Sequence, residues 1–317
     1  MKKLTLHLGM HRCASTTMQN LLRANKGLLA ERGIGMILRA DMMADSRLDM
    51  RAWHRRKAFD PRMRGAPKRF IAAVEAMPFD HVIVSEESLL STMPAVREHS
   101  FYPFAEKFLE CLEPLSQHFD LRLRFVVRRQ DRYVESVYGF RLVRGLPEDF
   151  RTFLAAFPEE CFDWCKFTAA LDRRGLTNNS RFAVMDHWLG LELNQYLAAL
   201  VDIDPVGLAL NSRGNPSLPA VHLPLLLAMN HAGLMPDLSE RKTKLLPMIA
   251  SLAEPNMEAV AELLVAADVK KLDQCFDTEA STGFAADARA KFLSVYRGAN
   301  KRFLEHAAVR TTPSIWG

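Results

Sequence analysis

The chain has 317 residues, of which 49% are hydrophobic and 25% are charged. This length is enough for one large core, and the composition does not fit the disordered or fibrous classes. The membrane-spanning class is excluded because no run of about 18 apolar residues exists. The formal charge of +5 suits an anionic ligand, and a solvated basic surface would also explain it. The five cysteines are odd in number and lack C-x-x-C pairing, which predicts free thiols. No secretory signal opens the sequence, so we expect a cytoplasmic protein.

The most informative stretch is a predicted strand, turn and helix near the amino terminus. Residues 4–8 are predicted to form a buried strand, and the apolar positions Met18, Leu21 and Leu22 follow at the spacing of one helix face. A turn of this kind directs the backbone N–H groups of the helix at an anion. It also contains the guanidinium of Arg12 and four hydroxyl or thiol groups, from Cys13, Ser15, Thr16 and Thr17. The sequence therefore predicts a phosphate or sulfate site here.

The residues that this turn lacks narrow the choice of anion. A P-loop for ATP or GTP reads G-x-x-x-x-G-K-[ST], and its Lys reaches the β- and γ-phosphates. Counting from Gly9, this chain has Ala14 at the second Gly and Ser15 at the Lys, while Arg12 stands earlier in the loop. Residues 9–16 resemble the G-x-x-[KR]-[ST]-G-T-[ST] loop with which sulfotransferases bind the 5′-phosphosulfate of 3′-phosphoadenosine 5′-phosphosulfate (PAPS). Cys13 in place of Ser or Thr would weaken one hydrogen bond, and Ala14 in place of Gly requires a negative φ or a small steric cost.

Two adjacent acids end the next strong strand pattern. Residues 81–85 are predicted to form a buried strand that leads into Glu86 and Glu87, and ligands of open α/β sheets lie at the carboxyl ends of strands. Residues 85–90 are similar to the S-x-E segment of the sulfotransferase family, with Glu87 on the family's Glu. Consecutive strand-end residues point in opposite directions, so only one of the two acids can face the site. We expect this acid to be Glu87 and to act as the general base, because Glu87 matches the Glu of the S-x-E segment. Glu86 is the alternative for the general base, unless it only caps the following helix. His54 is the next candidate for this role.

A second predicted phosphate site follows the strand predicted at residues 121–127. Arg128 stands at its carboxyl end and Ser136 eight residues later, one turn into a helix, so that both side chains can converge on one phosphate. This spacing looks like the 3′-phosphate motif of the same family, R-x-x-x-x-x-x-x-S. The spacing alone is common, but its combination with the loop at Gly9 is specific.

A basic segment lies between these motifs. Residues 51–69 contain eight Arg and Lys residues and one acid, Asp60. The segment is either a solvated loop or a flap that attracts an anionic ligand. Nucleic acid is the less favoured partner, because only Trp53 and Phe59 could stack on bases and no binding module surrounds them.

The rest of the chain is predicted to be mainly helical. Residues 104–115, 150–157, 163–173 and 193–201 have helical spacing, and residues 181–185 are predicted as the last core strand. Residues 210–218 resemble the family's N-x-S-L turn near the nucleotide, which makes Arg213, Gly214 and Ser217 candidate contacts, and a plain linker fits as well. His7 and His11 lie on a strand and a loop without a third ligand, so we predict no metal site.

Together these patterns predict one α/β domain over residues 1–317, with a parallel sheet flanked by helices in residues 1–210 and a mainly helical extension in residues 211–317. The resemblance implies a P-loop-like sulfotransferase fold and transfer of a sulfuryl group from PAPS, without a metal, to a hydroxyl or amine of a small-molecule or carbohydrate acceptor. It places Arg12 and Glu87 in catalysis, and residues 12–17, Arg128, Ser136, Arg213 and Gly214 on the nucleotide. Two alternatives stay open, namely a nucleotide kinase and a nucleotide- or glycan-binding protein without turnover.

Overall fold

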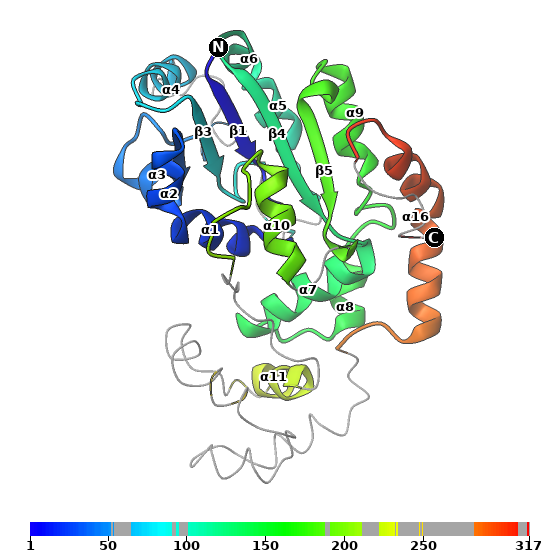
Figure 1. Ribbon diagram of the computed structural model, residues 1–317. Coiled ribbons are helices and arrows are strands. Elements are labelled where there is room, and N and C mark those ends of the chain that lie inside the picture. Colours follow the sequence, from blue (N-terminus) through cyan, green and yellow to red (C-terminus); the bar gives the residue numbers. More distant parts are fainter. Residues whose placement is uncertain are drawn as a thin grey trace.

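The computed structural model describes residues 1–51, 53, 65–90, 93–94, 101–187, 191–210, 222–231, 233, 247, 249, 282–309 and 316. These residues contain a five-stranded sheet with the order β2-β3-β1-β4-β5, in which all neighbouring strands are parallel. Figure 1 shows the sheet with its carboxyl edge downward. The strands are β1 (Lys3–His7), β2 (Ile34–Leu38), β3 (His81–Ser85), β4 (Asp120–Val127) and β5 (Ser180–Val184). The predicted α/β class with a parallel sheet flanked by helices is confirmed.

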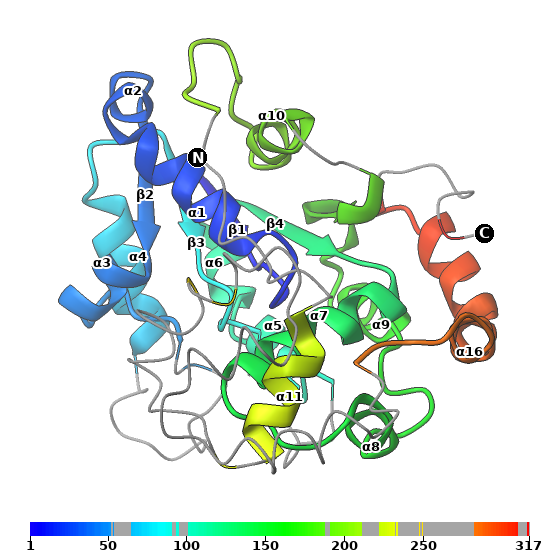
Figure 2. The same cartoon turned by 90° about the horizontal axis from the view of Figure 1, so that it is seen from below.

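The sheet is buried because helices cover both of its faces, as parallel sheets require. Figure 2 shows α1 (Ser15–Ala24) and α10 (Leu191–Leu200) on one face. The opposite face is covered by α4 (Ala66–Glu75), α5 (Ala105–Glu110), α6 (Glu113–His118) and α9 (Cys165–Arg173). All five residues of β3 are buried, which fits the unbroken apolar run at its centre, residues 82–84.

Shorter elements complete the sheet region. They are α2 (Lys26–Glu31), α3 (Arg39–Ala44) and the two 3₁₀ turns η1 (Thr177–Asn179) and η2 (Met185–His187). The segment predicted as one helix at residues 104–115 forms the two helices α5 and α6 instead. Pro114 occupies the first turn of α6, where its missing N–H costs nothing, whereas in the interior of one long helix it would remove a hydrogen bond.

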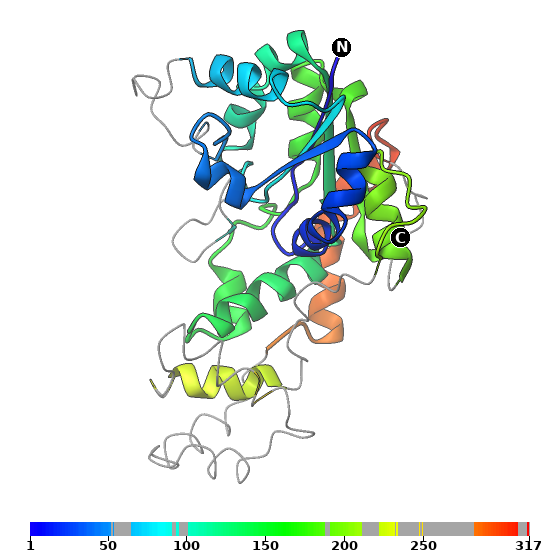
Figure 3. The same cartoon turned by 60° about the vertical axis from the view of Figure 1, so that its left-hand side comes forward.

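Helices also lie beyond the carboxyl edge of the sheet. They are α7 (Gln130–Val143), α8 (Phe150–Ala155) and α11 (Leu223–His231), and Figures 1 and 3 both show α11 on the far side of α7 from the sheet. Asn230 fixes α11 there, because its side-chain amide donates to the carbonyl groups of Leu142 (2.9 Å) and Leu146 (2.8 Å).

The last described helix packs beside β5. This helix, α16 (Ala286–Glu305), places Phe303 against Phe182, with ring centroids 5.3 Å apart. The backbone N–H of Phe182 donates to the carbonyl of Ala308 at 2.7 Å, just after the helix. None of the described helices is long and apolar enough to cross a membrane.

Candidate functional site

The loop between β1 and α1 has a backbone conformation suited to anions. Arg12 (φ 64°) and Ala14 (φ 58°) are both left-handed, so that the chain folds into a concave turn. Ala14 caps α1 without a side-chain hydrogen bond. The first N–H groups of a helix lack intrahelical acceptors, and concave turns of this type bind anions. The sequence left two possibilities for Ala14, a negative φ or a small steric cost, and its positive φ shows that the second applies.

Gly9 is required by the close approach of this loop to its neighbours. A Cβ atom at position 9 would lie 2.9 Å from the Cβ of Ser15 and 3.0 Å from the Cε1 of His7. The first contact is shorter than real Cβ atoms show and the second is unusually tight, so a larger residue would require the start of α1 or the His7 ring to shift. This is one position of the motif whose residue type follows directly from geometry.

The side chains of His7 and Tyr102 pack at the two ends of the first part of this loop. His7 is buried, its Nδ1 hydrogen bonds to the Ser85 hydroxyl (2.8 Å), and burial lowers its pKa to about 4, so the imidazole is neutral at neutral pH. The backbone N–H of His11 donates to the hydroxyl of Tyr102 (2.7 Å), whose ring stacks on the imidazole of His11. Burial raises the pKa of Tyr102, so this hydroxyl remains neutral.

Arg12 connects the two predicted phosphate motifs. Its Nε donates a hydrogen bond to the hydroxyl of Ser136 on α7 at 3.1 Å, and its guanidinium lies 5.3 Å from the ring centroid of Phe140. Burial lowers the pKa of Arg12, and the nearby charge of Arg128 lowers it further. Two guanidinium groups that repel each other in a partly buried space favour an anion between them.

The turn at Arg128, at the end of β4, is held by Asp186, which lies after β5, and by Trp164, which precedes α9. Its Nε lies 3.6 Å from a carboxylate oxygen of Asp186, too far for a hydrogen bond, and this buried atom has no acceptor among the described residues. The second oxygen of Asp186 accepts from the backbone N–H of Arg129 (2.6 Å). The indole N–H of Trp164 donates to the carbonyl of Arg128 (2.9 Å). The turn is therefore fixed, while one donor of Arg128 is unused.

The two adjacent acids after β3 face different surroundings, as consecutive strand-end residues should. Glu86 is 1% exposed, accepts from the Ser88 hydroxyl (2.5 Å) and lies 3.4 Å from Arg39. Glu87 faces the loop, where its carboxylate accepts a short hydrogen bond from Ser15 and lies 3.8 Å from the imidazole of His11. Of the two acids, Glu87 is therefore the one at the loop between β1 and α1, residues 8–14, which we call the anion loop.

The remaining predicted contacts of the loop divide into two groups. Cys13 is fully buried, burial raises its pKa to about 12, and its N–H donates to the carbonyl of Met10 (3.1 Å), so in this conformation it packs the loop rather than facing a ligand. Thr16 and Thr17 are half-buried at the start of α1, and their hydroxyl groups have no hydrogen-bond partner within the described residues. The predicted contacts Arg213, Gly214 and Ser217, and the alternative base His54, lie outside the described residues.

Sequence reasoning missed three residues of this site. Asp186 is the second residue after β5, so the strand-end argument that singled out Glu87 and Arg128 could have found it. Tyr102 and Phe140 act through contacts with His11 and Arg12 that cross the fold, and no local pattern marks them. No cluster of three or more His, Cys, Asp or Glu side chains in the described parts of the chain could hold a metal ion.

Comparisons with known proteins add no relative to this description. The chain matches no protein-family model, and searches of curated proteins and of solved structures find no match either.

Proposed function

We propose that this protein is a PAPS-dependent sulfotransferase with a P-loop-like fold, which transfers a sulfuryl group to a hydroxyl or amine of a small-molecule or carbohydrate acceptor in the cytoplasm. The observation that carries the proposal is the hydrogen bond between Arg12 and Ser136. It joins the anion loop after β1 to α7, the helix that begins two residues after Arg128. A nucleotide with anionic groups at both its 5′ and 3′ positions needs two such sites side by side.

The groups around the two sites fit this donor. The left-handed loop and the first turn of α1 offer backbone donors to the phosphosulfate, and the unused buried Nε of Arg128 offers one to the 3′-phosphate. Hydrogen bonds to charged groups are among the stronger ones in proteins. Arg12 lies close to both sites and is suited to stabilise the negative charge that develops on the leaving oxygen.

Glu87 is suited to accept the proton of the acceptor. In the transfer, the acceptor oxygen or nitrogen forms a bond to sulfur while the bond from sulfur to the bridging oxygen breaks, and adenosine 3′,5′-bisphosphate leaves. The acceptor proton needs a base within about 3 Å. Glu87 is half-buried at the mouth of the loop, and its partner Ser15 can rotate its hydroxyl from the carboxylate to the incoming anion.

A second candidate is a kinase, and the contact between Glu87 and Ser15 favours it. In P-loop enzymes a loop hydroxyl and a carboxylate from a neighbouring strand hold Mg²⁺ against the phosphates of ATP. The loop lacks the Lys that such enzymes place on the terminal phosphates, and Ser15 stands in its position. For this reason we prefer the sulfotransferase.

A thermal-shift comparison separates the candidates. The full chain is heated alone and with PAPS, adenosine 3′,5′-bisphosphate, ATP with Mg²⁺ or GTP with Mg²⁺. At a ligand concentration of about 100 times Kd, binding adds about 2.7 kcal/mol to stability, which is a shift of several degrees. We expect PAPS and the bisphosphate to raise the melting temperature and ATP and GTP to do little. A shift with ATP or GTP alone would overturn the proposal in favour of the kinase. Binding of PAPS without sulfation of any acceptor in a broad phenol, amine and sugar panel would favour a binding protein without turnover.

A further inference from the structure

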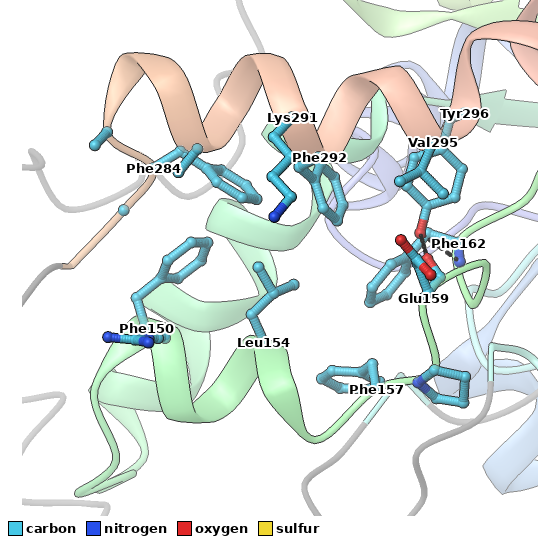
Figure 4. A pocket seen from close by; sticks show the side chains of 15 residues that line it. Phe150, Leu154, Phe157, Glu159, Phe162, Phe284, Lys291, Phe292, Val295 and Tyr296 are labelled. Carbon is cyan, nitrogen blue, oxygen red and sulfur yellow. Dashed lines mark hydrogen bonds between the residues drawn. The ribbon is translucent and has the colours of Figure 1, made fainter.

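A cavity of about 470 Å³ lies between α8 and α16, and none of the predicted nucleotide or catalytic residues lines it. Its walls come from α8, from the segment that follows it, and from the start of α16 (Figure 4). A volume of this size is in the range of small-molecule sites. The chemistry of the anion loop does not require this cavity, which therefore needs its own explanation.

Aromatic side chains form most of the wall. Phe284 makes an edge contact with Phe150 (ring centroids 4.7 Å, interplanar angle 80°) and a tilted contact with Phe292 (4.7 Å, 38°). Phe157 and Phe162 pack together on the other side, with centroids 5.2 Å apart. Rings that present edges and tilted faces favour a flat aromatic ligand, because aromatic pairs prefer edge-to-face and offset-stacked contacts.

The charged groups of the cavity are mainly basic. Lys291 and Arg151 line it, together with the single acid Glu159. Figure 4 shows the Lys291 side chain extending from α16 toward Leu154, while Glu159 lies at the Tyr296 end. The carboxylate of Asp149 is close enough to Arg151 to interact with its positive charge, whereas no carboxylate of the described residues forms an ion pair with Lys291. A cation at an apolar cavity, with the acid at one end, selects for a ligand with one anionic group.

The cavity is preformed, because the start of α16 is fixed to α7. Arg289 donates to the carboxylates of Asp131 (2.5 Å) and Glu135 (2.6 Å), and the backbone N–H of Phe284 donates to Glu135 (3.2 Å). A ligand would therefore bind without the entropic cost of ordering this wall, and preorganisation of this kind favours affinity.

We propose that the cavity between α8 and α16 binds a flat aromatic molecule with a single carboxylate, with the rings among the phenylalanines and the carboxylate near Lys291 and Arg151. This proposal is independent of the proposed function, since it uses none of the residues assigned to PAPS.

The test is calorimetric titration of the full chain with three probes of one shape and different charge. These are 2-naphthoate, the neutral 2-naphthamide and the cationic 2-naphthylmethylammonium. We expect affinity to fall in that order. Charge reversal by Lys291→Glu should weaken binding of 2-naphthoate about tenfold and strengthen binding of the cation, since it removes an exposed ion pair with the carboxylate and adds repulsion. Lys301→Glu, an exposed change further along α16, is the matched control and should leave all three affinities unchanged.

A second variant tests the location of the site. Leu154→Trp places a larger side chain in the cavity and should abolish binding of all three probes. If this variant does not fold, Ala288→Trp does the same from an exposed position on α16. Equal affinity for the three probes, no binding of 2-naphthoate at millimolar concentration, or binding that survives the Trp variants would each overturn the proposal.

Discussion

The loop after β1 and the turn after β4 stand at neighbouring strand ends and each carry one Arg of the proposed nucleotide site, yet they are built differently. The first owes its shape mainly to the backbone, with left-handed residues at Arg12 and Ala14 and a helix start without a side-chain cap, although Tyr102 also holds the N–H of His11. The second owes its shape to side chains, because Asp186 and Trp164 hold the turn at Arg128 in place.

This difference determines which substitutions each region tolerates. Backbone N–H groups do not depend on the identity of the side chain, so the loop keeps its concave form with Cys13 and Ala14 at positions where the sulfotransferase pattern that it resembles has a hydroxyl residue and Gly. In the proposed site, Arg128 has no such freedom, because its guanidinium must bind the phosphate from a fixed turn. Lys at this position would offer a point charge in place of the planar, multiple-donor guanidinium. Under the proposed function, substitutions in the two regions should therefore differ in which quantity they change and by how much.

The largest effect is expected where Glu87 contacts the backbone-built loop. Glu87→Gln removes the proposed general base and should lower kcat about 10²- to 10⁴-fold while PAPS affinity is unchanged, because the base acts on the acceptor only. Steady-state kinetics and calorimetry measure the two quantities. Glu86→Gln is the matched control and should leave kcat unaltered, since Glu86 faces Arg39 and Ser88. A larger loss of kcat in Glu86→Gln would show that the wrong acid had been assigned.

Under the proposed function, Arg12 supplies a charged donor that the backbone N–H groups of the anion loop cannot supply. Arg12→Ala should lower kcat about 10²-fold or more, by analogy with the loss of one donor to a developing oxyanion. Arg23→Ala removes a charge from an exposed position of α1 and should leave kcat unchanged. Turnover near that of the parent protein in Arg12→Ala would remove Arg12 from the mechanism and would leave the loop as a purely backbone site.

The sequence predicted the strand ends well, because apolar runs and the residues after them are local. The strand predicted at residues 81–85 has those bounds in the structure, and Glu87 and Arg128 lie at the sheet edge where the strand rule puts them. The break between α5 and α6 was missed even though Pro114 signals it. The contacts of Tyr102 and Phe140 could not be predicted, since they join residues from distant segments. The left-handed φ of Ala14 was one of two options that only the structure distinguishes.

The side-chain-built turn should show its effect in nucleotide affinity. Arg128→Ala should weaken binding of adenosine 3′,5′-bisphosphate about 10- to 100-fold, since hydrogen bonds to charged groups contribute about 1.5–3 kcal/mol. Ser136→Ala should have a smaller effect, because it removes a neutral donor. Neither change should alter the affinity for adenosine 5′-monophosphate, which lacks the 3′-phosphate.

The matched control for this pair is Arg132→Ala, an exposed position on the same helix. It removes the same charge outside the site and should affect both nucleotides little. Equal losses for the two nucleotides in Arg128→Ala would mean that the turn is structural and that the 3′-phosphate binds elsewhere.

The smallest effect, and the sharpest test of the backbone argument, is expected at Ala14. A left-handed conformation costs a residue with a Cβ about 1–2 kcal/mol, and Gly avoids this cost but loses about 0.5–1 kcal/mol of conformational entropy on folding. Ala14→Gly should therefore raise the free energy of unfolding by about 0.5–1 kcal/mol in urea titration. Ala72→Gly, at an exposed position inside α4, should lower it by about 1 kcal/mol, because that residue is already in a favourable helical conformation. Since the loop presents backbone N–H groups, nucleotide affinity in Ala14→Gly should stay within about threefold of the parent value, below the 1.4 kcal/mol of a tenfold change. Destabilisation of both variants by the same amount would contradict the left-handed conformation at Ala14 and, with it, the backbone origin of the anion site.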